Sequence, residues 1–162
     1  QRQMCIRDRT GLTHLQEAIG MTRAFGVEFT RPFYLGVLAD SLLRAGAADE
    51  GLATIEEAMA LVEKNEDRFY EAELRRLWGE LLALQDREAH RDQIEALFNA
   101  SLATAQQQQA RSLALRTATS LCRWHAGTDR EGEALATLEA IYQSFNEGHD
   151  TADLKAAAAL LA

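Results

Sequence analysis

The chain has 162 residues, a net charge of −8 and 47% apolar residues, which fits one soluble domain with a sizeable core. Its acidity argues against nucleic acid and membrane surfaces as partners, because phosphate binding needs a basic footprint. The longest apolar run, Ala156–Ala162, is shorter than the roughly 20 residues that span a bilayer. Without a signal-peptide pattern at the start, the sequence predicts a cytoplasmic protein.

The first nine residues have the appearance of an added segment. Met4–Arg9 (MCIRDR) is what a common transposase-end sequencing adapter encodes in this frame. We therefore expect residues 1–9 to be a non-native scar, and residues 10–162 to be one helical repeat domain from a larger protein. The scar has a net charge of +2, so the remainder has −10. Cys122 is then the only cysteine, which agrees with a reducing compartment.

Good helix formers dominate the composition, and apolar periodicity predicts an all-helical chain. The expected helices are at about 10–25, 32–45, 49–64, 68–85, 88–107, 110–126, 129–147 and 151–161. Pro32 suits a first helical turn, whereas Gly46 suits a helix end. Asp49 and Glu50 complement the positive end of the third helix.

Later boundaries depend on weaker signals. Asp67 is expected to cap the fourth helix, and Thr128-x-x-Glu131 has the pattern of a capping box. The run 106–109, which is all Gln, separates two helices without a Gly or Pro. Gly26 and Gly148 are expected to end the first and seventh helices.

The fourth helix has apolar or small residues on two faces. Its main stripe lies within about 40° of one direction, while small and apolar residues occupy the opposite face. The stripe consists of Tyr70, Leu74, Leu77, Leu81 and Leu84, and the opposite face of Ala72, Gly79, Leu82 and Ala83. This pattern predicts a helix packed on both sides. Glu73 and Arg76 are expected to form a helix-surface ion pair.

A pattern of apolar, bulky and small residues recurs in the second helix of each expected hairpin. Its members are Gly11-Leu15-Ala18, Gly51-Ile55-Ala58, Ile94-Phe98-Ser101 and Ala134-Leu138-Ile141. The bulky residues are spaced by 40, 43 and 40 positions. Such a period is typical of helical solenoids, so we predict a tetratricopeptide-like, right-handed superhelical solenoid of antiparallel helix hairpins. A HEAT-like array is the alternative on period alone.

Three segments carry a family resemblance: AELRRLWGELLAL (Ala72–Leu84), ARSLALRTATSLCRW (Ala110–Trp124) and IYQSFNEGHDTADLKAAAALL (Ile141–Leu161). They resemble the C-terminal tetratricopeptide-like region of bacterial proteins that join a class III adenylate/guanylate cyclase to an AAA-type signalling ATPase. Similar regions occur in ATPase-type transcriptional regulators of the maltose-activator kind. The resemblance implies a sensor or scaffold arm that binds a protein partner or its own upstream ATPase or cyclase domain.

No catalytic, cofactor-binding or metal site is expected in this segment. The sequence has no G-x4-G-K-[ST] loop, no G-x-G-x-x-G and no H-E-x-x-H. Cys122 and His125 share one helix face, but two ligands do not make a zinc site, and a packed Cys beside a partly exposed His is the favoured interpretation. An enzyme is therefore the least favoured of the function classes.

Trp78 lies at the edge of its helix's apolar stripe, next to Arg75 and Arg76. A tryptophan beside arginines has the composition of a binding hot spot, so these three residues are the candidate interaction surface. For Trp78 itself, filling a gap between repeats is the favoured role over that of a binding hot spot. For the whole chain, we expect a non-catalytic interaction arm. The alternative is a structural spacer or homo-oligomerisation scaffold.

Overall fold

The computed structural model describes Gly11 and residues 13–15, 17–21 and 29–162. Residues 29–162 form seven helices, and residues 13–15 and 17–21 are also helical. The seven are α2 (Arg31–Ala45), α3 (Ala48–Asn65), α4 (Glu71–Asp86), α5 (Arg91–Gln107), α6 (Arg111–His125), α7 (Glu131–Tyr142) and α8 (Ala152–Leu161). The expected scar at 1–9 and the expected helix end at Gly26 lie outside the described residues. The all-helical prediction is confirmed for the part described.

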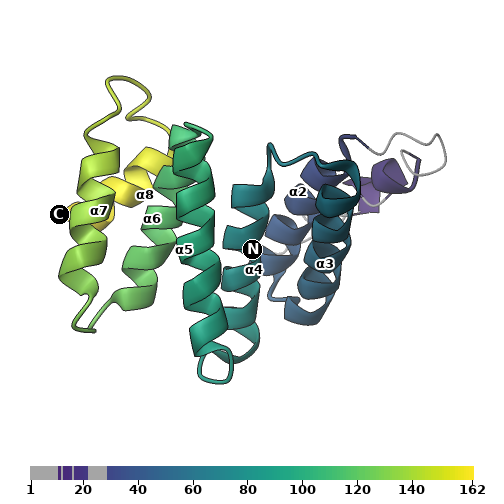
Figure 1. Cartoon of the computed structure of the whole chain (residues 1–162), viewed down its shortest axis with the longest axis horizontal. Helices are drawn as coiled ribbons and strands as arrows, with labels where there is room; N and C mark the ends of the chain where they lie inside the picture. The colour runs from purple at the N-terminus through teal and green to yellow at the C-terminus, as the bar shows by residue number, and fades with distance from the viewer. Residues whose placement is uncertain (1–10, 12, 16, 22–28) are drawn as a thin grey trace.

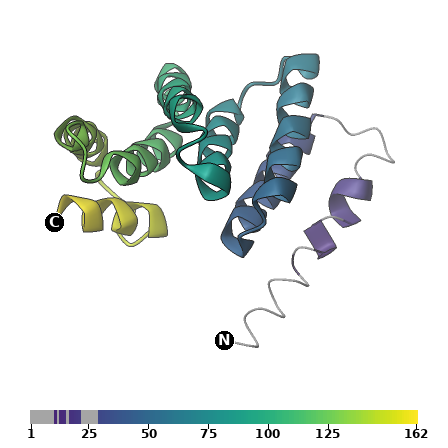
Figure 2. The same ribbon diagram turned by 90° about the horizontal axis from the view of Figure 1, so that it is seen from below.

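Consecutive helices pack as hairpins that follow one another along the long axis of the molecule (Figures 1 and 2). The most extensive contacts join α2 to α3, α4 to α5 and α6 to α7. The first helix of each hairpin also contacts the first helix of the next unit, in the pairs α2–α4, α4–α6 and α6–α8. The second helices α3, α5 and α7 make no such contacts with one another. The first helices therefore form one continuous layer.

The recurring pattern of the second helices marks their buried face. Gly51, Ile55 and Ala58 of α3 are buried, as are the corresponding residues of α5, among them Phe98. In α7, Ala134 and Leu138 are buried and Ile141 is half-buried. The first occurrence of this pattern, Gly11-Leu15-Ala18, differs from the others, because Leu15 is only half-buried and Ala18 is exposed.

Helix α4 is buried on two faces, as its sequence predicts. Leu74, Leu77 and Leu81 are fully buried on one face, and Ala72 and Gly79 are buried on the other. A Cβ added to Gly79 would lie 2.7 Å from Cε1 of Phe98, so a glycine allows α5 to approach closely. The expected core position of Leu84 is wrong. Leu84, in the last turn of the helix, is 45% exposed.

Most helix ends follow the sequence signals. Pro32 lies in the first turn of α2, Asp49 and Glu50 lie in the first turn of α3, and Gly46 ends α2 with a left-handed φ of 75°. Gln109 also has a positive φ, of 55°, which explains how the glutamine run turns the chain between α5 and α6. A residue other than Gly therefore makes this turn.

Three boundary predictions are wrong. Helix α4 begins at Glu71 with Tyr70 as its N-cap, so Asp67 does not cap it. Helix α7 ends at Tyr142, and Gly148 belongs to the following loop. The expected capping box is displaced, because the Glu131 carboxylate accepts a hydrogen bond from the backbone N–H of Gly127 rather than from Thr128.

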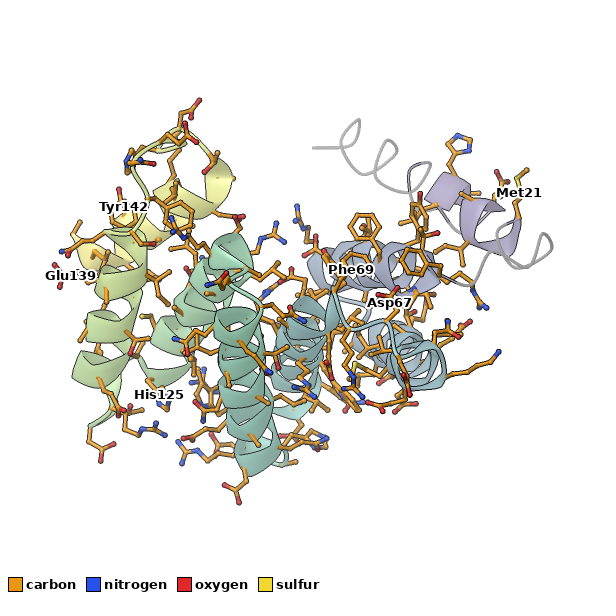
Figure 3. The ribbon with its side chains drawn as sticks, turned by 45° about the horizontal axis from the view of Figure 1, so that its top comes forward. Met21, Asp67, Phe69, His125, Glu139 and Tyr142 are labelled. Atoms are coloured by element: carbon orange, nitrogen blue, oxygen red, sulfur yellow. The ribbon has the colours of Figure 1, made fainter. Side chains whose placement is uncertain are left out.

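Two main apolar clusters run through the array, and a third, minor one consists of Ala72, Ala105 and Ala114. The larger joins α2 to α5 and reaches α6 through Leu121 and Trp124. The smaller joins α6, α7 and α8, with Leu138 at its centre and Tyr142 and Phe145 packed at its margin. Figure 3 shows Tyr142 near one end of the array and Phe69 closer to the middle of the molecule. Among the described residues, no helix is both long and apolar enough to cross a membrane.

Candidate functional site

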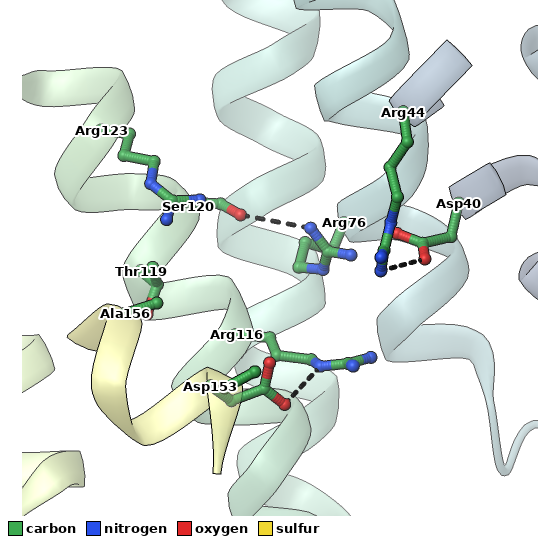
Figure 4. A pocket seen from close by; sticks show the side chains of 10 residues that line it. Asp40, Arg44, Arg76, Arg116, Thr119, Ser120, Arg123, Asp153 and Ala156 are labelled. Atoms are coloured by element: carbon green, nitrogen blue, oxygen red, sulfur yellow. Dashed lines mark hydrogen bonds and ion pairs between the residues drawn. The ribbon is translucent and has the colours of Figure 1, made fainter. Parts of the chain in front are cut away.

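A cleft of about 260 Å³ opens on the layer of first helices (Figure 4). Helices α2, α4, α6 and α8 all contribute to its lining. The lining residues are Asp40, Arg44, Arg76, Arg116, Thr119, Ser120, Arg123, Ala152, Asp153 and Ala156. Four of these ten side chains are arginines, in a chain whose net charge is −8. The cleft therefore concentrates guanidinium groups, although neighbouring carboxylates, among them Asp40 and Asp153 in the lining itself, offset their charge.

Helix α6 supplies half of the polar lining residues. Arg116, Ser120 and Arg123 are spaced by four and three residues, so they lie along one face of the helix. The opposite face of α6 is apolar, with Leu115, Ala118 and Cys122 in the smaller cluster. Packing of that face against α7 and α8 therefore turns the arginine face toward the cleft.

A buried carboxylate lies beneath the arginines. Glu73 of α4 is 1% exposed, and it accepts hydrogen bonds from Arg76 at 3.0 and 2.8 Å. Its Oε1 atom also accepts a hydrogen bond of 2.8 Å from Nη1 of Arg116, which is 43 residues away in the chain. Arg116 reaches Asp153 of α8 with its Nε atom at 2.8 Å. A chain of ion pairs thus links three successive first helices.

These contacts keep both arginines charged. Burial by itself lowers the pKa of Arg116, but attraction to Glu73 and the hydrogen bond to Asp153 raise it more, so the net pKa is raised. Burial likewise lowers the pKa of Arg76, while the hydrogen bond and attraction to Glu73 outweigh it and raise the pKa. The base of the cleft therefore carries permanent positive charges that already have internal partners.

The rim of the cleft differs from its base. Arg44 pairs with Asp40 at 2.6 Å on the surface of α2, and its side chain is 74% exposed. Arg123 of α6 is exposed and makes no ion pair or hydrogen bond with any described residue. Ser120, by contrast, donates a hydrogen bond of 2.6 Å to Glu80. Among the described residues that line the cleft, Arg123 is thus the arginine without an ion pair or hydrogen bond.

The sequence-predicted surface is only partly in this cleft. Arg76 lines it, but Arg75 points elsewhere, donating hydrogen bonds to Glu71 at 2.6 Å and to Thr104 at 2.7 Å. Trp78 is half-buried and packs against the larger apolar cluster. Arg76 and Trp78 point about 160° apart around α4, at about 100° per residue. The three residues therefore do not share one face.

The expected surface ion pair between Glu73 and Arg76 exists, but it is buried. Sequence reasoning missed this because the burial comes from α6, through Arg116 and Ser120. It also missed Arg116, Arg123 and Asp153 as site residues. The one available signal was the spacing of Arg116, Ser120 and Arg123 along one face of the predicted helix.

The Cys122–His125 pair lies behind the cleft rather than in it. Cys122 is buried, and burial followed by the nearby Glu131 charge raises the pKa of its thiol. His125 is also buried, with 5% exposure, so the expectation of a partly exposed His is wrong. Among the described residues, no three His, Cys, Asp or Glu side chains lie close enough together to hold a metal ion.

The lining chemistry favours binding of an anion. Its hydroxyl groups are engaged within the fold, because Thr119 donates to the Leu115 carbonyl and Ser120 to Glu80. Guanidinium groups form paired, directional hydrogen bonds with carboxylates and phosphates. Comparison with known proteins adds no assignment, since neither a protein-family model nor a curated protein matches this chain.

Proposed function

We propose that this chain is a non-catalytic protein-interaction and regulatory arm, and that its binding face is the arginine-lined cleft. The single observation that carries the proposal is that the cleft is assembled from α2, α4, α6 and α8, the first helices of successive units. In this proposal the array is a tetratricopeptide-like, right-handed superhelical solenoid, and the first helices line its inner surface. The contacts between consecutive first helices support that arrangement.

The resemblance of its segments suggests where such an arm would act. We place it in a bacterial signalling ATPase or nucleotide cyclase, or in a related transcriptional regulator. Its partner is then another protein or the ATPase or cyclase domain of its own parent chain. The proposal draws support from the sequence segments around Ala72–Leu84 and Ala110–Trp124, the second of which supplies the arginine face of α6.

Site-specific photo-crosslinking tests the proposed binding face. Ala152 is exposed and lines the cleft, so a photoreactive phenylalanine analogue there should cross-link a bound protein. Ala136 of α7 is exposed and is not part of the cleft, so it provides a matched control. The full chain with each substitution would be irradiated in bacterial cells and its adducts identified by mass spectrometry.

The expected result is a discrete protein adduct from position 152 and none of the same mass from position 136. The adduct should disappear when Arg123→Glu is added to the position-152 variant, since that change reverses the charge at the rim. Equal adducts from both positions, or no adduct from position 152, would contradict the proposed face.

A homo-oligomerisation scaffold is the second candidate, and an aromatic cluster favours it. Phe33 contacts Tyr34, Phe69 and Tyr70 with ring centroids 5.5, 6.3 and 4.9 Å apart. Phe69 remains 49% exposed, in the segment between α3 and α4 (Figure 3). Exposed aromatic groups of this kind are common at interfaces. Sedimentation that depends on protein concentration, and that Phe69→Ser abolishes, would support this scaffold.

A further inference from the structure

The arginine-lined cleft has a charge pattern that selects among anions. We propose that it binds a single carboxylate group from an acidic segment of a partner protein, with Arg123 as the primary contact and Arg44 on the opposite wall. This inference rests on the proposed function and names the chemistry of the partner. Figure 4 shows Arg123 on α6 and Arg44 on α2 on either side of Arg76.

Arg123 provides the vacant contact. Arg76 and Arg116 are held by Glu73, with further contacts to Glu80 and Asp153, so neither guanidinium is released without breaking its pair with the buried Glu73 carboxylate. Arg123 has no such partner among the described residues and is exposed at the rim. A carboxylate arriving there gains a charge-assisted hydrogen bond without displacing anything.

Arg44 can join Arg123 at low cost. Its present partner, Asp40, is one turn away on the same helix, and the Arg44 side chain is mostly exposed. Exposed ion pairs of this kind contribute little, so exchange of Asp40 for a ligand carboxylate is close to balanced. Two guanidinium groups from different helices would then hold one ligand group.

The overall charge of the cleft favours a monoanion. The four arginines Arg44, Arg76, Arg116 and Arg123 are matched by the four carboxylates Asp40, Glu73, Glu80 and Asp153. A carboxylate therefore adds one negative charge to a neutral group, whereas a phosphate monoester adds nearly two. The rest of this acidic chain repels an acidic partner, so binding is directed to the cleft.

A peptide titration tests the proposal on the full chain. The probe is a short peptide of alternating Gly and Glu with blocked ends, compared with Gly–Gln and Gly–phosphoserine versions. Binding is followed through the Nε–Hε signals of ¹⁵N-labelled arginines. Arg123→Ala is the test variant, and Arg91→Ala is its matched control, because Arg91 is likewise exposed but lies on α5, outside the cleft.

We expect the Gly–Glu peptide to shift the Arg123 signal saturably, with Arg123→Ala weakening the affinity about tenfold and Arg91→Ala leaving it unchanged. Added salt should weaken binding, and the Gly–Gln peptide should not bind. Equal affinity of the two variants, absence of saturable binding, or tighter binding of the phosphoserine peptide would overturn the inference. Any of these contradicting results, together with a specific photo-crosslinked adduct at position 152, would overturn the carboxylate preference but leave the proposed function standing. The same results without that adduct would overturn the proposed function as well.

Discussion

Glu73 and Arg116 meet across the boundary between α4 and α6, with Oε1 and Nη1 2.8 Å apart, although 43 residues separate them in the chain. The Glu73 side chain is 1% exposed and the Arg116 side chain is 35% exposed, so the carboxylate is shielded from water while the arginine remains partly accessible. Arg116 then continues to Asp153 on α8. One buried carboxylate thus helps to hold three first helices in register, and the cleft above it depends on that register.

Replacing the buried carboxylate should be costly. Glu73→Gln removes the charge that two arginines share. Because Arg76 and Arg116 are only partly buried, with side chains 11% and 35% exposed, the cost should be about 3 kcal/mol, the lower end of the range for a fully buried pair. Urea denaturation of the variant and of the wild type measures the difference. Glu139→Gln, on the exposed face of α7, is the matched control and should change the stability by less than about 0.5 kcal/mol. Similar small losses for both variants would show that Glu73 is not a buried partner.

The apolar interior gives a second prediction. Leu77→Ala and Phe98→Ala should each lower the free energy of unfolding by about 2–5 kcal/mol, because both side chains are buried and each truncation leaves a cavity. Leu84→Ala, on the exposed last turn of the same helix as Leu77, is the control. In chemical denaturation, Leu77→Ala and Phe98→Ala should be much less stable than Leu84→Ala. Losses below about 1 kcal/mol at both buried sites would contradict the packing.

Gly79 tests the close approach of α4 to α5. Gly79→Ala should destabilise the fold by about 1–3 kcal/mol through overpacking against the Phe98 ring, although Ala is intrinsically the better helix former. Phe98→Leu in the same chain should recover part of this loss, because it removes the ring atoms that the new methyl group meets. A stabilising Gly79→Ala, measured by thermal unfolding, would mean that the two helices lie further apart.

Local rules predict local features of this fold, such as the helix end at Gly46 and the paired faces of α4. They fail where a distant segment decides the outcome. Glu73 and Arg76 have the spacing of a surface pair, and only the arrival of α6 buries them. Asp67 is a residue type that often caps helices, but α4 begins four residues later, at Glu71. The rings of Phe69 and Tyr70, which precede that start, pack against Phe33 on α2. The cleft could not be predicted for the same reason, since four helices build it.

Alkaline pH should weaken the fold through Tyr70. Burial, followed by the nearby Glu73 charge, raises its pKa above the ordinary value of 10.0. A raised pKa means that the folded state favours the protonated phenol, so this contribution is complete below pH 10.0 and is lost as the pH rises through the folded-state pKa. Tyr70→Phe should therefore lose less stability than the wild type between about pH 10 and pH 12.

Denaturant unfolding across that pH range measures the effect, with Tyr34→Phe as the control on an exposed neighbouring ring. All three proteins should also lose stability as the buried Cys122 thiol, whose pKa is raised, begins to ionise, so this loss cancels in the comparison. Parallel curves for Tyr70→Phe and the wild type would contradict the raised pKa of the half-buried Tyr70.

Contact between the first helices of adjacent hairpins is the relationship on which the cleft depends, and nuclear Overhauser effects test it most directly. A Cβ added to Gly36 of α2 would lie 3.0 Å from Cδ2 of Leu74 on α4. We predict a strong effect between the Gly36 Hα protons and the Leu74 methyl group in the full chain. If that signal is absent while the α4–α5 signal between Gly79 and the Phe98 ring is present, the hairpins form but do not stack through their first helices.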